Sequence, residues 1–106
     1  MNNFGLSERT INDINTYFEK AGNDYESARL YVQQTIKYNS NWGGEDPVWY
    51  GLTTFTGNCY VHALIYKTFL DKLGYENQLI WTTDQTHYWN LIKINGVSIM
   101  SIEKNA

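Results

Sequence analysis

The run from Asn58 to Leu73 constrains the fold most, because its apolar residues surround most of the circumference of a helix. Asn58 is a good N-cap residue, Lys72 suits the last turn, and Gly74 suits the position just after the helix. Such a helix must be covered on several sides, so the sequence predicts a central, buried helix. Its two apolar sides consist of Cys59, Ala63, Tyr66, Leu70 and Leu73, and of Val61, Leu64, Ile65 and Phe69.

Two further helices are predicted ahead of it. The first runs from a capping-box pattern at about residue 10 to Gly22, and the second runs from residues 23–24 to near Tyr38. The second carries a clear amphipathic stripe at Ala28, Tyr31, Val32, Thr35 and Ile36. Residues 39–57 are predicted to be irregular. They form either a functional loop or a surface loop pinned by Trp42 and Trp49.

After Gly74 the pattern changes to that of strands. Residues 77–83 and 86–94 read as two strands, with His87 and Trp89 on one face of the second and Tyr88 on the other. Asn95-Gly96 is a strong hairpin signal, so residues 97–102 should return antiparallel. Helices followed by a meander of strands indicate an α+β fold, and 106 residues suit a single domain, residues 1–106.

Composition excludes several classes of function and structure. The single cysteine allows no internal disulfide, and a net charge of −3 without a basic run argues against a nucleic-acid partner. No window approaches eighteen apolar residues, so no membrane span is expected. The first ten residues lack the pattern of a signal peptide. Location stays open, and a fragment of a secreted or surface protein is compatible with these features.

Cys59 has two readings. A buried cysteine usually serves as a small apolar side chain. On the first turn of a helix, however, free N–H groups and the helix dipole favour a thiolate, which makes a nucleophile. His87, at the start of a later strand, would supply the base. A polar group on the neighbouring strand would orient its ring.

Two stretches carry a resemblance to a known family. "GNCYVHALIYKTFLDKLGYENQLIW" followed by "THYWNLIKING" resembles the transglutaminase-like superfamily, which has a papain-like core. The likeness covers about residues 25–97, with the Cys and His segments its most specific parts. It implies α+β architecture, with the Cys at a helix N-terminus packed on a short antiparallel sheet. It also implies Cys59 as nucleophile, His87 as base, a protein or peptide amide as substrate, and no cofactor or metal.

The chain departs from this family after Gly96. The resemblance asks for an aromatic residue and an Asp on the last strand, but the chain reads "VSIMSIEKNA". Ile102 stands where the Asp is expected. The neighbouring Glu103 is the candidate third catalytic residue, although a one-residue slip turns a strand side chain to the opposite face unless a bulge re-aims it. The domain is therefore expected to be truncated or altered at about residues 97–106.

Other residues complete the predicted site. The backbone N–H of Cys59 would stabilise an oxyanion, and Trp49, Tyr50 and Trp89 are candidates for the oxyanion site or the cleft wall. Two alternatives remain. The domain could be catalytically impaired and bind peptides through residues 42–50. A zinc site of Cys59, His62, Asp84 and His87 is weaker, because only one C-x-x-H pair is present.

Overall fold

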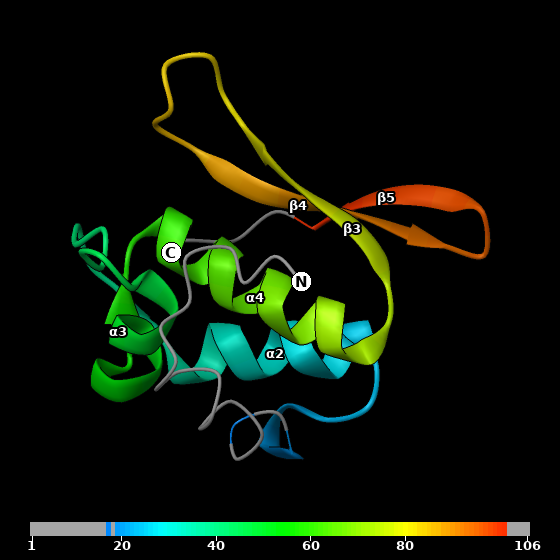
Figure 1. Ribbon diagram of the computed structural model, residues 1–106, viewed down its shortest axis with the longest axis horizontal. Coiled ribbons are helices and arrows are strands. Elements are labelled where there is room, and N and C mark those ends of the chain that lie inside the picture. Colours follow the sequence, from blue (N-terminus) through cyan, green and yellow to red (C-terminus); the bar gives the residue numbers. More distant parts are fainter. Residues whose placement is uncertain (1–16, 18, 102–106) are drawn as a thin grey trace.

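The predicted central helix is α4, Cys59–Leu73, and it lies between the other helices and a sheet in the computed structural model (Figure 1). The structure describes residues 17 and 19–101. Asn58 caps α4, since its side-chain oxygen accepts a hydrogen bond from the Val61 N–H at 3.1 Å. Gly74 ends it in the left-handed conformation, with φ of +90°. Both predicted ends of the helix are therefore confirmed, as is its burial.

Two helices and one sheet cover α4. Helices α2, Tyr25–Thr35, and α3, Pro47–Thr54, pack against it on the side away from the sheet (Figure 1). The sheet consists of β3, Glu76–Trp81, β4, Tyr88–Ile94, and β5, Val97–Ser101, in the order β3-β4-β5 with antiparallel pairing. This arrangement is an α+β fold, as predicted. None of the helices within residues 17 and 19–101 is long and apolar enough to cross a membrane.

Strand β4 turns alternate side chains toward the helix. Tyr88, Asn90 and Ile92 are buried on the α4 side. The turn between β4 and β5 is the predicted two-residue hairpin, with positive φ at Asn95, +52°, and at Gly96, +82°. Positive φ at both central residues is the requirement of a type I′ turn, which asparagine and glycine meet at low cost.

The connection between α2 and α4 differs from the prediction. Helix α2 ends at Thr35 rather than near Tyr38, because Ile36 is extended, with φ of −100° and ψ of 113°. The next two residues form β1, Lys37–Tyr38, which pairs in parallel with β2, Thr56–Gly57. The prediction of an irregular segment 39–57 was also wrong, because it contains α3 and β2. Helix α3 begins at an Asp46 cap followed by Pro47, which is a favourable helix start.

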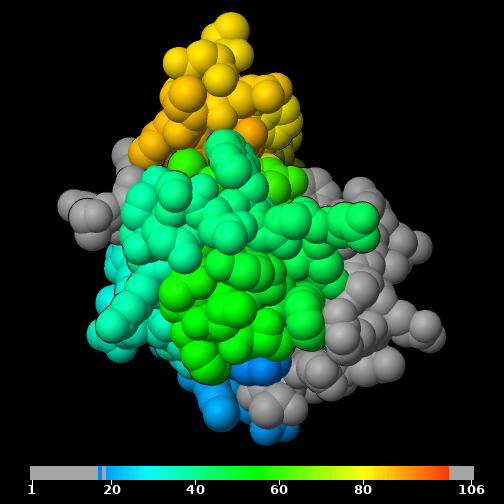
Figure 2. Space-filling model, turned by 90° about the vertical axis from the view of Figure 1, so that its left-hand side faces the viewer, coloured from blue at the N-terminus to red at the C-terminus, as the bar shows by residue number. Residues whose placement is uncertain are grey.

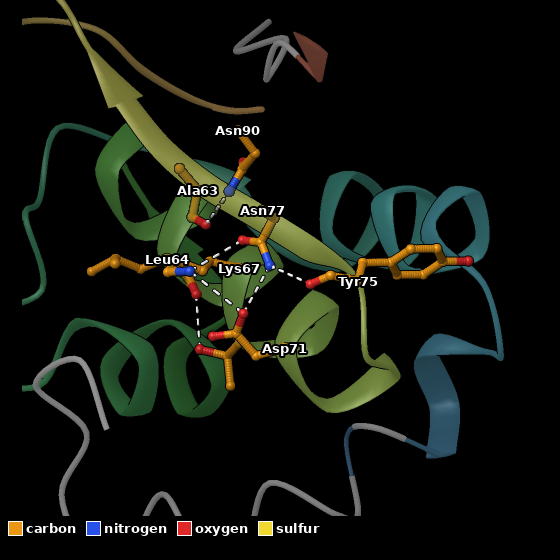
Figure 3. Close-up of polar contacts among 8 residues, drawn as sticks. Ala63, Leu64, Lys67, Asp71, Tyr75, Asn77 and Asn90 are labelled. Carbon is orange, nitrogen blue, oxygen red and sulfur yellow. Dashed lines mark hydrogen bonds and ion pairs between the residues drawn. The ribbon is translucent and has the colours of Figure 1, made fainter. Parts of the chain in front are cut away.

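A polar network joins the C-terminal half of α4 to the start of β3 (Figure 3). The Asn77 amide donates to Asp71 at 2.8 Å, and Lys67 donates to the Asn77 side-chain oxygen at 3.2 Å. Lys67 also forms an ion pair with Asp71 at 3.4 Å. These contacts hold the β3 end of the sheet on α4.

The first predicted helix is described only near its end. Gly22, the predicted end, has φ of +93° after helical residues 19–21. The predicted start of that helix lies outside the described residues, and so do residues 102–106 with Glu103.

Candidate functional site

Cys59 lies on the first turn of α4 and is held there by a close backbone approach. A Cβ atom on Gly57 would lie 2.4 Å from Val61 Cγ1, so only glycine fits at this position. The Asn58 N–H donates to the Asn41 carbonyl at 3.0 Å, which ties the start of the helix to the preceding loop. The Cys59 side chain is 4% exposed. The chain thus places its only cysteine at a fixed and nearly buried point.

The thiol contacts the segment that carries His87. Cys59 Sγ donates to the Thr86 carbonyl oxygen at 3.7 Å, across 27 positions of sequence. Thr86 directly precedes His87, so the residue next to the predicted base contacts the predicted nucleophile. Sulfur is a weak hydrogen-bond donor, and the contact therefore indicates proximity more than binding strength.

Aromatic rings surround the thiol. Tyr88 and Ala63 form one apolar cluster with Cys59, and Tyr60 packs against it. The Tyr60 and Tyr88 ring centroids are 4.8 Å apart. Burial, and next the nearby Tyr60 and Cys59, raise the pKa of Tyr88 above its ordinary value. The Tyr88 phenol is therefore a neutral wall of the site at physiological pH.

Two tryptophans continue the aromatic cluster to the surface. Trp42 lies 5.4 Å from Tyr60 and 5.7 Å from Tyr88 between ring centroids, and Trp81 lies 6.1 Å from Tyr88. Trp42 is 47% exposed and Trp81 is 50% exposed. The rings of these four residues form what we call the aromatic cluster, which extends from the thiol to solvent.

The His87 ring lies beside Trp89. Their centroids are 5.6 Å apart, and the Trp89 indole N–H donates to the Met100 sulfur at 2.9 Å. Since Tyr88 packs against Cys59, the His87 and Trp89 side chains belong to the other side of the strand, as the alternation predicts. The structure therefore brings the backbone before His87 to the thiol, through Thr86, and does not bring the His87 ring to it. The His87 backbone N–H donates to the Thr82 hydroxyl at 3.3 Å, which fixes the start of β4.

Of the other predicted site residues, two lie on α3 and one lies beyond the described residues. Trp49 and Tyr50 are on α3, where the Tyr50 hydroxyl accepts from Thr56 at 3.3 Å. This hydrogen bond, and next one with Asn39, lower the pKa of Tyr50. Glu103 lies beyond the described residues. Tyr50 is thus joined to β2, the strand that leads into Asn58 and Cys59.

His62 has a structural position one turn after Cys59. Its Nδ1 lies 2.8 Å from the Asn58 carbonyl oxygen, and its Nε2 lies 2.8 Å from the Ile36 carbonyl oxygen. A neutral imidazole donates to only one of the two, and which one depends on its tautomer. Both ring nitrogens are engaged by backbone. Among the residues that the structure describes, no three His, Cys, Asp or Glu side chains are grouped so that they could hold a metal ion.

Sequence reasoning missed the residues that stand closest to the thiol. Tyr60, Tyr88 and the Thr86 carbonyl were not predicted site members, and Asp84 was considered only as a metal ligand. The pattern "TTDQTH" carries a local signal, because an Asp flanked by Thr residues favours a side-chain-capped turn. The contact of Tyr88 with Cys59 depends on which face of β4 meets α4, which alternation alone does not decide.

Comparisons of the chain with protein-family models, with curated proteins and with solved structures found no match.

Proposed function

We propose that the chain is a transglutaminase-like cysteine enzyme with a papain-like core, which transfers or hydrolyses acyl groups at amide carbonyls of a protein or peptide. One observation carries the proposal. The only cysteine, on the first turn of a central helix, contacts the residue directly before His87. The backbone N–H groups of the first turn offer donors to an oxyanion.

The proposed reaction has two steps. The reaction requires the His87 ring to turn from the Trp89 side of β4 toward the thiol. Cys59 Sγ then attacks the amide carbonyl carbon, the C–N bond breaks, and the imidazolium of His87 gives its proton to the leaving amine. A thioester remains on Cys59. Water or an amine then attacks it, His87 takes the proton of the attacking group, and the C–S bond breaks to regenerate the thiolate. Water gives hydrolysis or deamidation, and an amine gives a cross-link.

The third member of the proposed triad is Glu103. It would orient the His87 ring and stabilise the imidazolium. Because Ile102 occupies the position at which the family resemblance asks for Asp, we expect lower activity than a complete triad would give. Replacing Ile102 by Asp is expected to raise the rate if the strand continues in register.

An activated ester tests the nucleophile and its base together. We expect p-nitrophenyl acetate to place one acetyl group on Cys59, which mass spectrometry locates and p-nitrophenolate release times. His87→Ala should slow this acylation at pH 7 by about 10²- to 10⁴-fold, the usual contribution of general acid–base catalysis. Thr83→Ala, an exposed change in the adjoining turn, is the matched control. An acylation rate that is the same in His87→Ala and in the parent chain refutes the proposal.

A second candidate function is a peptide-binding module on the same fold. It is favoured by the aromatic cluster, whose Trp42 and Trp81 expose about half of their surfaces. Aromatic residues are enriched where proteins bind peptides. Failure of His87→Ala to change the acylation rate would favour this function. Loss of peptide capture in Trp42→Ala or Trp81→Ala would then support it.

A further inference from the structure

The turn between β3 and β4 is organised by one carboxylate oxygen. Asp84 Oδ1 accepts from the Thr82 hydroxyl at 2.6 Å, from the Thr86 hydroxyl at 2.8 Å and from the Thr86 N–H at 3.2 Å. The Gln85 N–H donates to the Thr82 carbonyl at 2.9 Å, and Gln85 has φ of +59°. The turn, residues 82–86, is therefore organised by hydrogen bonds around Asp84.

The same turn holds both parts of the proposed catalytic pair. Thr86 gives its N–H and hydroxyl to Asp84, and its carbonyl accepts from Cys59 Sγ. Thr82 gives its hydroxyl hydrogen to Asp84, and the oxygen of that hydroxyl accepts from the His87 N–H. The Thr82 N–H also donates to the His87 carbonyl at 3.1 Å. Asp84 is thus connected to the His87 backbone through the Thr82 hydroxyl. It is connected to the Cys59 thiol through Thr86.

The position of the turn makes its hydrogen bonds important (Figure 2). The end of the β3–β4 hairpin projects from the body of the molecule, and residues 83–86 are exposed. A projecting turn has little packing to fix it, so its hydrogen bonds must do so. The hydrogen bonds from Thr82 and then Thr86 lower the pKa of Asp84, which keeps its carboxylate ionised and accepting at neutral pH.

We propose that Asp84 is a positioning residue for the Cys59–His87 pair, acting through the hydrogen bonds of the 82–86 turn. It supplies, by way of the backbone, part of the placement of His87 that the family resemblance assigns to an acid on the last strand. This inference rests on the proposed function. It concerns geometry and makes no claim that the Asp84 carboxylate touches substrate or the His87 ring.

A double-mutant cycle tests this role, with p-nitrophenyl acetate as the probe. Asp84→Ala should slow acylation of Cys59 by about 10- to 100-fold, the effect expected of a misplacement near 1 Å. In a His87→Ala background the same change should alter the rate by less than about twofold, because its effect runs through His87. Equal slowing in both backgrounds would show a general structural effect and overturn the proposal, as would no slowing in either.

A conservative variant separates geometry from charge. Asp84→Asn keeps an acceptor oxygen at the same position but removes the charge, so we expect it to restore most of the rate lost in Asp84→Ala. If it is as slow as Asp84→Ala, the positioning role is refuted. Asp71→Ala is the matched control, since Asp71 is also an exposed, hydrogen-bonded aspartate but lies in the α4–β3 network (Figure 3).

The two proposals fail in different ways. If His87→Ala does not slow acylation, the proposed enzyme function fails and the role of Asp84 fails with it. If His87→Ala slows acylation but Asp84→Ala does not, only the role of Asp84 fails.

Discussion

Asn90 offers a prediction about stability, because one side of its buried amide is hydrogen-bonded and the other side is not. Its side chain is fully buried between β4 and α4. The amide nitrogen donates to the Ala63 carbonyl at 3.1 Å (Figure 3), whereas Oδ1 has no hydrogen-bond partner among the residues that the structure describes. The amide nitrogen therefore stabilises the fold through its hydrogen bond, whereas the buried Oδ1 lowers stability because it has lost its hydrogen bonds to water.

The two contributions can be compared for Asn90→Leu. Losing the bond to Ala63 should cost about 0.5–1.5 kcal/mol, while removing an unsatisfied buried acceptor should return about 1–3 kcal/mol. Leucine branches at the same atom as asparagine, and such swaps of similar shape usually cost less than about 1.5 kcal/mol. We therefore expect the free energy of unfolding of Asn90→Leu to lie between about 2 kcal/mol below and 2.5 kcal/mol above that of the parent chain.

Asn90→Asp is expected to destabilise the fold although it leaves the shape of the side chain almost unchanged. It replaces the donor that faces the Ala63 carbonyl by an oxygen and places an uncompensated charge in the core, at a cost of about 3–5 kcal/mol at pH 7. Burial raises the pKa of such a carboxyl, so the folded state binds its proton more tightly than the unfolded state. The stability of this variant should therefore fall as the pH rises above about 4.

Urea unfolding of the three proteins at pH 4.5 and pH 7.5 would measure these differences from the midpoints at constant m-value. A loss of more than about 2 kcal/mol in Asn90→Leu, within the range typical of a large core defect, would refute the view that Oδ1 is unsatisfied. It would indicate instead that a buried water supplies a donor.

Two further predictions concern the surroundings of Cys59. Gly57→Ala should cost about 1–3 kcal/mol in urea unfolding, because the new Cβ would lie 2.4 Å from Cγ1 and 2.5 Å from Cβ of Val61. A loss below about 0.5 kcal/mol, the range of an ordinary surface substitution, would contradict the steric cause. The raised pKa of Tyr88 means that the folded state holds the phenol proton more tightly, so stability present below pH 10 should decline above it. Tyr88→Phe should decline less steeply between pH 9 and 11 in thermal unfolding, and parallel curves would count against this.

Local signals in the sequence predicted α4 and the β4–β5 hairpin well. The cap at Asn58, the left-handed Gly74 and the Asn95-Gly96 turn each depend on residues within a few positions. The α+β arrangement followed because a helix that is apolar on most sides has to be covered. The Thr86 contact brings the backbone before His87 to Cys59, but Tyr88 rather than His87 packs on the thiol, so the pairing of the two predicted side chains stays a prediction.

The missed elements depend on contacts that are distant in sequence. Strands β1 and β2 have two residues each. They form because Lys37 pairs with Thr56, which follows it in the chain only after α3. A pair so short has no periodicity to detect. Helix α3 did have a local signal in Asp46-Pro47, which the surrounding glycines and tryptophans obscured.

The burial of Cys59 also has a redox consequence. It is the only cysteine in these 106 residues and it is 4% exposed, so no disulfide can form among them and any other disulfide requires the thiol to be uncovered first. Peroxide likewise reaches a sulfur at a rate set by access and by thiolate character. Because Tyr60, Tyr88 and the Thr86 carbonyl lie against this sulfur, its oxidation rate depends on how often these groups move away from it, independently of any substrate.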